Sequence, residues 1–383
     1  MPHQDSLEDR SRDILSVTAK ISHERIAPAA AKRDLNGTYP WEELHLLGQA
    51  GLLAPNVSQD HGGAGLSREG FSSVVKELAR RCASTALVSV SHSIVAKALE
   101  SAGTEAATER LLPKLVDGRL IAAFAVHEAG SGSNAGAISS RAERVSDRYV
   151  ANGSKIFVTS GGEADVYLVL LRTQSSGQPQ GMSMLVVEKD TPGLSFGRCE
   201  DRMGMRGTSS REMFLTDCEI PVENLVGEEG QGTRVIGQSV VGWGFFGAAA
   251  IGVGLAQSAL DIAVKHAKER TIAGQAIGTY QAIQFMITDM AVGTEAADAL
   301  LMSCAAQADR SPDTAVMNAF RAKLFASETA VKVTDTALQV LGGHGYCREY
   351  GVERLYRDAR GLTLHFKTSE WLRQDIAKAV LGL

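Results

Sequence analysis

The chain has 383 residues, of which 44% are hydrophobic and 22% charged, and this predicts a globular protein of two or three domains. The formal net charge of −5 gives no reason to expect nucleic acid or an anionic membrane surface as a partner. The five cysteines include no C-x-x-C pair, which argues against a disulfide framework or a metal site. The N-terminus is polar and no apolar run is long enough to span a membrane, which predicts a cytoplasmic location.

A helical period governs the start of the chain. Apolar residues recur at three- and four-residue spacings, as at Ile14, Val17 and Ile21, which predicts amphipathic helices. A later apolar helix carries His92, a candidate for a substrate pocket, although a lone histidine in such a helix is more often a core residue. Residues 1–118 are therefore predicted to form a helical N-terminal domain.

Short β-branched and aromatic runs follow, and they predict a β-barrel domain over residues 119–230. One run ends at Ala151 and the next includes Lys155, with Asn152-Gly153 between them, a pair that predicts the tight turn of a β-hairpin. No strand is followed by a glycine-rich turn and a helix, which disfavours a Rossmann nucleotide site.

The helical period returns over residues 231–383 and predicts four long helices in a C-terminal bundle. Ser311-Pro312 has the pattern of an N-cap with proline at the first helical position. The helix that follows is expected to end at Gly342-Gly343, where glycine suits both a helix end and a close approach to a ligand.

The stretch from Gln339 to Lys367 resembles the C-terminal signature of the acyl-CoA dehydrogenase superfamily. That signature is a Gln-x-x-Gly-Gly turn, an Arg-Asp-Ala segment and a short Glu-Gly-Thr-Ser run. The resemblance extends over nearly the whole chain. It implies an α+β fold with an N-terminal helical domain, a middle β-barrel domain and a C-terminal four-helix bundle.

The resemblance implies that FAD lies between the β domain and the C-terminal bundle. Phe157-Val158-Thr159 stands where the family has Trp-Ile-Thr, and His127 begins a match to its Thr-Glu-Pro-x-Ala-Gly-Ser-Asp loop. Arg270 and Gln281 match a motif that binds the pyrophosphate and adenine across a subunit interface, which implies a homo-oligomer, either a dimer or a tetramer. The implied FAD contacts are Phe124, Val126, His127, Ser133, Phe157, Thr159, Arg270, Gln281, Gln339, Gly342, Gly343, Thr368 and Glu370.

The family's catalytic glutamate has no counterpart at either position where the family places it. Phe366 stands in the Glu-Gly-Thr-Ser run, and Gly244 stands at the alternative position on the first bundle helix, followed by Phe245 in place of an arginine. His127 and His365 are then the nearest titratable candidates for the base. The predicted catalytic residues are His365, His127 and Phe366, and the predicted substrate pocket is His92, Trp243, Gly244, Phe245 and Phe366.

Three reactions remain open at this point. The first is α,β-dehydrogenation of an acyl thioester by a non-standard base, with an electron-acceptor protein as redox partner. The second is a flavin-dependent monooxygenase, which needs a flavin reductase rather than an α-base. The third is a non-redox eliminase or desulfinase-like reaction. Phe245 replaces an arginine that assists substrate binding in the family, which weakens the assignment of CoA. The acyl group is therefore expected on either CoA or a carrier protein.

Overall fold

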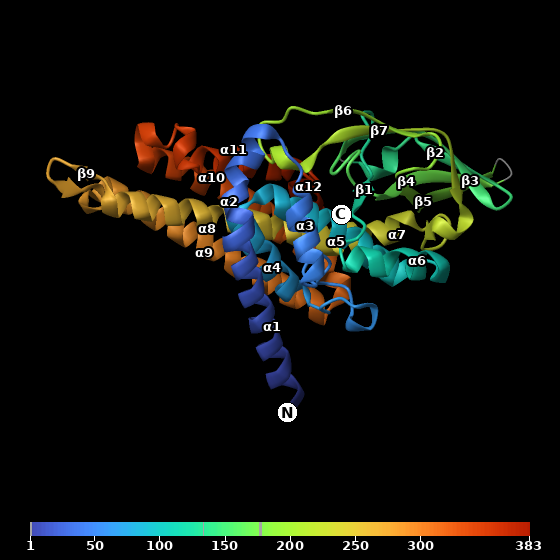
Figure 1. Ribbon diagram of the computed structural model, residues 1–383, viewed down its shortest axis with the longest axis horizontal. Coiled ribbons are helices and arrows are strands. Elements are labelled where there is room, and N and C mark those ends of the chain that lie inside the picture. The colour runs from blue at the N-terminus through green and yellow to red at the C-terminus, as the bar shows by residue number, and fades with distance from the viewer. Residues whose placement is uncertain (1, 133, 176–177) are drawn as a thin grey trace.

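The computed structural model describes residues 2–132, 134–175 and 178–383, and it has a helical, a β and a second helical region in chain order (Figure 1). Helix gives way to strand between Val116 and Ala122, and strand gives way to helix between Val226 and Gly232. This three-part fold confirms the fold class predicted from the sequence.

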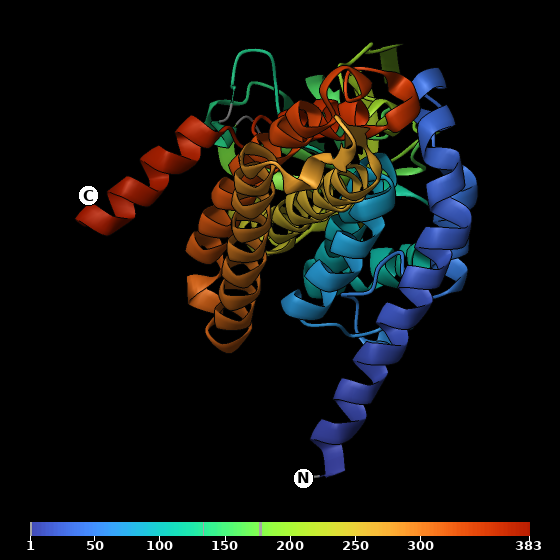
Figure 2. The same cartoon turned by 90° about the vertical axis from the view of Figure 1, so that its left-hand side faces the viewer.

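The N-terminal region is built around one enclosed helix, α5. Its side chains from Ala83 to Ala96 are all buried. Apolar and small residues lie on every face of this helix, as expected of a helix without a solvent face. By contrast, α1 projects away from the body of the molecule in both views (Figures 1 and 2). The helices are α1 (Pro2–Ile21), α2 (Ala27–Asn36), α3 (Trp41–Gln49), α4 (Arg68–Arg81), α5 (Ala83–Ala102) and α6 (Glu105–Val116).

The middle region is a mixed eight-stranded sheet within the described residues. Its strand order is β6-β7-β3-β2-β4-β5-β8, and β1 pairs with β4. The pairs β1–β4 and β2–β4 are parallel, whereas the other pairs are antiparallel. The residues from Val166 to Leu171 on β4 are fully buried, which explains why this strand reads as an unbroken apolar run. The strands are β1 (Ala122–Ala125), β2 (Arg141–Val145), β3 (Arg148–Val158), β4 (Val166–Ser175), β5 (Gln178–Glu188), β6 (Leu194–Cys199), β7 (Arg211–Pro221) and β8 (Leu225–Val226).

The hairpin predicted at Asn152-Gly153 is wrong. These residues lie inside the continuous strand β3, at a shift in its register with β7, and the turn of the hairpin lies earlier, between β2 and β3. Gly153 has a φ of 142°, and a Cβ there would lie 2.3 Å from the Cβ of Ser140. The glycine therefore serves a bulge that passes close to another segment, and not a turn.

The C-terminal region contains three long helices and three shorter ones, where the sequence predicted four long helices. The glycine-rich helix α8 packs directly on α10: a Cβ on Gly252 would lie 2.9 Å from the carbonyl oxygen of Ala326, so the small residue permits the close approach. Ser311 precedes a short 3-10 turn at Pro312–Thr314, and α10 continues from it. The helices are α7 (Gly232–Ile236), α8 (Phe245–Glu269), α9 (Gln281–Arg310), α10 (Ala315–Leu341), α11 (Val352–Leu362) and α12 (Ser369–Leu381), with a π-helical segment (Gly237–Gly244) before α8 and a small β9–β10 hairpin (Thr271–Ile272 and Gln275–Ala276) after it.

One helical stretch, Gly232–Glu269, is long and apolar enough to cross a membrane by composition. Within its most apolar window, 94% of the residues are buried inside the structure. The burial accounts for its hydrophobicity, because a central helix of a bundle needs apolar residues on all faces.

Candidate active site

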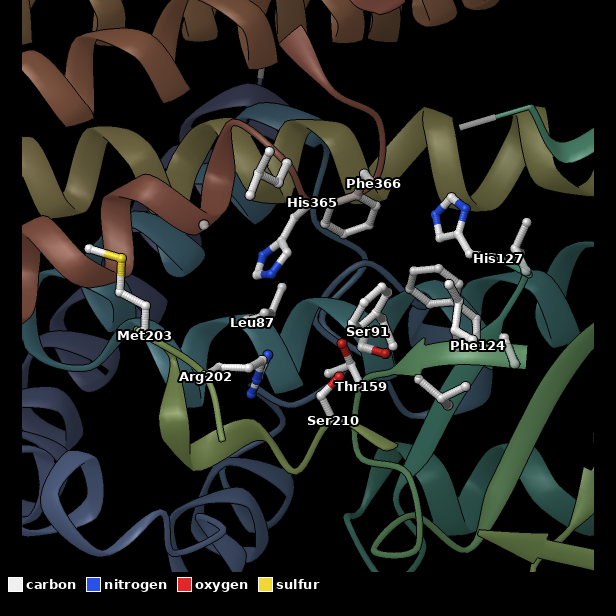
Figure 3. Close-up of a pocket in the computed structure, with 18 of the residues that line it drawn as sticks. Leu87, Ser91, Phe124, His127, Thr159, Arg202, Met203, Ser210, His365 and Phe366 are labelled. Carbon is white, nitrogen blue, oxygen red and sulfur yellow. The ribbon is translucent and has the colours of Figure 1, made fainter. Parts of the chain in front are cut away.

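A cavity of about 480 Å³ lies where the sheet meets the C-terminal helices. Five segments form its wall: α5, the end of β1 with the loop after it, the end of β3, the loop before β7, and α11 with the loop that follows (Figure 3). Its lining is mostly apolar and a small number of polar groups face into it, which is the usual character of a small-molecule site.

The loop after α11 carries His365 and Phe366 into the cavity. The main-chain N–H of His365 donates to the carbonyl of Gly361 at 3.0 Å, and the buried ammonium of Lys323 donates to the carbonyl of Lys367 at 2.7 Å. Phe366 has a φ of 61°, which is unfavourable for a residue with a side chain and is maintained here by these bonds on either side. The loop is thus anchored at both ends.

The ring of Phe366 is the centre of an aromatic cluster. It stacks on Phe124 with ring centres 5.8 Å apart and packs against Phe245 at 5.5 Å. A Cβ on Gly244 would lie 2.9 Å from Cε1 of Phe366. Of the predicted pocket residues, Phe366 lines the cavity, whereas Trp243, Gly244 and Phe245 are buried and do not line it.

His365 has an unused polar atom. Its Nδ1 is buried and has no hydrogen-bond partner within the protein, and glycine at position 361 leaves room for the ring, since a Cβ there would lie 3.4 Å from Cε1. Burial, together with the positive charges of Arg202 and Lys323, lowers the pKa of His365 to about 3. The imidazole is therefore neutral at pH 7 and can accept a hydrogen bond.

His127 also lines the cavity, but main-chain groups surround its ring. Nδ1 lies 3.3 Å from the carbonyl oxygen of Gly132, and the main chain of Phe366 interacts with the same ring. Burial lowers the pKa of His127, although both main-chain contacts favour the protonated form. The two histidines predicted from the sequence thus share one cavity with Phe366 (Figure 3).

Glu128 is the one carboxylate residue that lines the cavity within the described part of the chain. Its carboxylate accepts hydrogen bonds from the main-chain and hydroxyl groups of Ser139 and Ser140, and it pairs with Lys155 at 2.7 Å. Although burial opposes ionisation, these bonds lower the pKa of Glu128 to about 2. With all of these partners, the carboxylate is a structural anion and a poor base.

His92 does not line the cavity, so its assignment to the substrate pocket is wrong. Nε2 lies 3.0 Å from the carbonyl oxygen of Leu115, and Nδ1 accepts the main-chain N–H of Ala122 at 3.1 Å. Burial lowers the pKa of His92 to about 4. The histidine is a neutral core residue that joins α5 to α6 and β1.

Of the residues implied to contact FAD, those at the ends of β1 and β3 meet at the cavity. Phe124, Val126, Phe157 and Thr159 line it together with His127. The ring of Phe157 is 64% exposed and its backbone has a φ of 52°, so it presents an open aromatic face. Ser133, the remaining residue implied in this region, lies outside the described residues.

The other implied FAD contacts lie outside the cavity. Arg270 follows α8, whose 25 residues separate it by about 37 Å from the end that contacts Phe366. The rings of His266 and His344 are 5.7 Å apart, which brings the end of α8 next to the Gly342-Gly343 turn. Arg270, Gln281, Gln339, Gly342, Gly343, Thr368 and Glu370 are all absent from the cavity wall.

The Gly342-Gly343 turn ends α10 as predicted. Gly342 has a φ of 59°, and no protein atom lies within 4 Å of a Cβ built on either glycine. At the start of α12, Thr368 accepts the main-chain N–H of Trp371 as an N-cap. The turn therefore leaves open space in which another molecule could approach the backbone.

Several polar residues of the cavity were not among the sequence candidates, and Arg202 and Ser91 are two of them. Arg202 comes from the loop before β7, and its Nε is buried without a partner. Ser91 is 1% exposed, and its hydroxyl also lacks a partner. Sequence reasoning selected His92 on the same helix, but neighbouring residues point about 100° apart, and periodicity alone does not say which of them faces a cavity.

Comparison with known proteins identifies the fold. Family models for the N-terminal, middle and C-terminal domains of acyl-CoA dehydrogenase match residues 8–119, 123–218 and 230–381. The chain belongs to the acyl-CoA dehydrogenase family. It is 38% identical to the mitochondrial isobutyryl-CoA dehydrogenase of Dictyostelium discoideum over 92% of this chain and 85% of that protein.

Solved structures agree with this assignment. Butyryl-CoA dehydrogenase from Megasphaera elsdenii superposes with a TM-score of 0.92 at 32% identity, covering 97% of this chain and 98% of that one. The prolyl acyl carrier protein oxidase AnaB superposes with a TM-score of 0.91 at 27% identity, covering 97% and 99%. The family uses FAD, so this chain is an acyl-CoA dehydrogenase-like flavoenzyme and an oxidoreductase.

The cavity suits the isoalloxazine ring of FAD. A flat aromatic ring with polar edges needs an apolar wall and a few hydrogen-bonding groups, and here the open face of Phe157 lies in the same wall as the hydroxyls of Thr159 and Ser210.

Proposed function

We propose that this protein catalyses α,β-dehydrogenation of an acyl thioester and that His365, rather than a carboxylate, takes up the α-proton. Two observations carry the proposal: His365 lines the cavity and has a buried, unpartnered Nδ1, whereas Glu128, the one carboxylate residue that lines the cavity within the described part of the chain, is committed to Lys155 and two serines. A general base must lie within hydrogen-bond reach of the proton that it removes. His365 lines the cavity, and its Nδ1 has no hydrogen bond within the protein that would have to break before it accepts a proton.

The substrate loses a proton from Cα and a hydride from Cβ and becomes an α,β-unsaturated thioester. Bound FAD supplies the oxidant, a hydride acceptor in this family's chemistry. Neutral His365 takes the proton, although burial and the positive charges of Arg202 and Lys323 lower its pKa and so oppose protonation. Lys323 also maintains the loop that positions His365. Phe124 and Phe366 exclude water from the reacting carbons, since their stacked rings form an apolar wall beside the histidine.

His127 is the weaker candidate for the base. Main-chain carbonyl oxygens of Gly132 and Phe366 accept hydrogen bonds from the ring of His127. A ring nitrogen that donates its proton to a carbonyl has no free lone pair with which to take up the α-proton. We therefore assign to His127 a positioning role at the loop that ends β1.

Replacement of each histidine tests the assignment. His365→Gln should slow anaerobic bleaching of the flavin by an acyl thioester by about 10²–10⁴-fold, the usual contribution of a positioned base, with the visible spectrum of bound FAD unchanged. His127→Gln is the matched control and should slow it far less. The reverse order of effects would transfer the role to His127.

The same assay separates the other two reactions. A monooxygenase would not bleach with thioesters and would form product only with reduced flavin and oxygen, supplied through a flavin reductase. A non-redox eliminase would consume the thioester without a change of flavin colour. Phe366→Glu, which places a carboxylate at the family position, should accelerate bleaching by a simple acyl-CoA only if the enzyme is a dehydrogenase.

We also propose that the acyl group arrives on CoA or on a carrier protein. Relatives that act on CoA thioesters share this fold, and so does an acyl carrier protein oxidase. In addition, Phe245 stands where the resemblance expects an arginine. Steady-state rates with the same acyl group on each of the two carriers would distinguish them.

An electron-acceptor protein is the expected redox partner. The cytoplasmic location stays a prediction.

A homo-oligomer, a dimer or a tetramer, is supported by the distance between Arg270 and the cavity. Because about 37 Å of α8 separates the two, Arg270 can serve a flavin only in another subunit. Exposed apolar side chains such as Phe285 and Val292 on α9 offer a surface for association. A monomer in sedimentation equilibrium that retains FAD would contradict the proposal.

A further inference from the structure

A second recess lies beside the cavity that suits the flavin ring. Its volume is about 470 Å³, within the range of about 300–1,000 Å³ that small-molecule sites occupy. Arg202, Met203 and Arg357 line both the recess and the cavity. Figure 3 shows Arg202 and Met203 on the side of the cavity away from His127. The recess therefore adjoins the cavity at the end that is remote from His127.

The lining of the recess is mostly charged, in contrast to the apolar lining of the cavity. The end of α2, the loop before β7, the turn between α10 and α11, and α11 itself contribute to it. Its charged residues are Arg202, Arg206, Arg348, Arg357, Asp34 and Asp201. Four arginines against two aspartates leave an excess of two positive charges. The recess therefore favours an anion as its ligand.

Both aspartates already have an arginine as partner. The two Nη atoms of Arg357 donate to the carboxylate of Asp34, at 2.9 and 2.6 Å. The carboxylate of Asp201 pairs with Arg206. Because each aspartate is engaged by an arginine of the same recess, the positive excess is left to the remaining two arginines.

Two of the arginines retain free donors. The side chain of Arg348 is exposed and makes no hydrogen bond or salt bridge within the described part of the chain. Arg206 uses Nε and Nη1 to contact the main chain and Asp201, whereas its Nη2 has no hydrogen-bond partner among the described residues. The two arginines are far apart in the sequence, yet they line one recess. A ligand with several oxygen atoms can therefore accept hydrogen bonds from both guanidinium groups.

The charge excess distinguishes a phosphate ligand from the alternatives. A cation would be repelled, and an apolar group would displace water from the arginines without replacing their hydrogen bonds. A single carboxylate would offset one of the two charges. A diphosphate carries at least two negative charges and has oxygen atoms on two phosphoryl groups, which matches two separate guanidinium groups.

We propose that the recess is a binding site for a small molecule that carries a diphosphate group, held by Arg206 and Arg348. The site is separate from the flavin and from the thioester, and the inference goes beyond the proposed dehydrogenation without resting on it. Arg202 lies in the wall that the recess shares with the cavity. A bound anion offsets the charge of Arg202, and reduction of the flavin adds negative charge beside the same wall, so we expect the two events to oppose each other.

Calorimetric titration of the FAD-loaded protein with inorganic pyrophosphate and with ADP tests the proposal. Low ionic strength is needed, because exposed charges are screened over about 10 Å at 0.1 M salt. Saturable binding of one equivalent per chain is expected for both anions. Tighter binding of ADP would identify a nucleotide as the ligand, and equal affinities would show that the diphosphate alone is recognised. No saturable binding of either anion would overturn the proposal.

Variants that remove a charge assign the site. Arg348→Met should weaken the binding of pyrophosphate by about 10- to 100-fold, the usual contribution of a charge-assisted hydrogen bond, and Arg206→Met should weaken it as well. Arg148→Met is the matched control, because it removes a cation that pairs with Glu219 outside the recess, and it should leave the affinity unchanged. An equal loss in the control would show a general effect of net charge and would refute the assignment.

Two further measurements show whether the site is separate. Arg348→Met should retain the FAD content of the wild type, and a saturating S-alkyl CoA thioether should leave the affinity for pyrophosphate unchanged. Loss of FAD from the variant would assign the recess to the flavin. Displacement of pyrophosphate by the thioether would assign it to the phosphates of CoA. Either result would overturn a separate site.

Reduction of the flavin tests the coupling. Pyrophosphate should bind more weakly to the dithionite-reduced enzyme than to the oxidised enzyme. By linkage, it should lower the midpoint potential of the bound FAD by the same free energy. Equal affinity for the two redox states would contradict the expected coupling.

Discussion

Replacement of Glu128 by glutamine should destabilise the protein by about 3 kcal/mol at neutral pH. The carboxylate is 5% exposed and pairs with Lys155, which is fully buried. A lowering of its pKa from 4.5 to about 2 corresponds to about 3 kcal/mol of stabilisation of the ionised form. Removal of one partner of a buried pair independently costs about 3–5 kcal/mol, since it leaves the other charge unpaired.

The dependence on pH has a definite sign. Because folding lowers the pKa of Glu128, its contribution is fully present above about pH 4.5 and is lost as the pH falls towards about 2. The wild type should therefore lose stability across this window through Glu128, and Glu128→Gln should lack that component. Burial lowers the pKa of Lys155 to about 8, so the lysine offsets part of the gain at neutral pH.

Urea unfolding of the FAD-loaded protein, followed by circular dichroism, measures both effects. Glu219→Gln is the matched control, because the pair of Glu219 with Arg148 is exposed and should contribute nothing measurable. The double variant Glu128→Gln/Lys155→Met should be more stable than Glu128→Gln alone, since it leaves no unpaired buried charge. A loss below about 1 kcal/mol in Glu128→Gln, or an unchanged acid profile, would refute the reasoning.

Three further predictions concern other parts of the chain. Arg270→Ala should lower the FAD content of the purified protein, because it removes a charge-assisted contact worth about 1.5–3 kcal/mol, and equal flavin content would show that Arg270 has no such role. His92→Leu should lower the free energy of unfolding by about 1–3 kcal/mol by leaving main-chain groups unpaired, yet the bleaching rate per bound flavin should stay unchanged. Gly244→Ala should destabilise by about 1–3 kcal/mol, because its Cβ would lie 2.6 Å from Ile94 and 2.9 Å from Phe366; thermal denaturation that matches the wild type would contradict this.

The sequence was most informative where a motif fixes several residues on one strand or loop. Phe157 and Thr159 belong to one short segment at the end of β3, and all of this segment from Ile156 to Thr159 lines the cavity. His365 and Phe366 follow α11 directly, and the match to the family signature was enough to place both at the site.

The failures occurred where a local pattern has two physical solutions. Asn152-Gly153 satisfies either a tight turn or a bulge, and the choice depends on Ser140, which is distant in the sequence. His92 and Ser91 share an apolar helix, and only the packing of α6 and β1 determines that the histidine faces the core. Arg202 carries no local signal, because the cavity that it lines is formed by segments that are distant in the sequence.

The two positions at which the resemblance places the family's glutamate, 244 and 366, are in contact in this structure. The ring of Phe366 occupies the space in front of Gly244, so a side chain at position 244 would collide with it. A glutamate at position 244 would therefore fit only if a smaller residue replaced Phe366. A glutamate in place of Phe366 would leave a void beside Gly244 and Phe124. If the enzyme is a dehydrogenase, as we propose, His365, which is adjacent to Phe366 and has an unpartnered nitrogen, is the candidate for the proton acceptor.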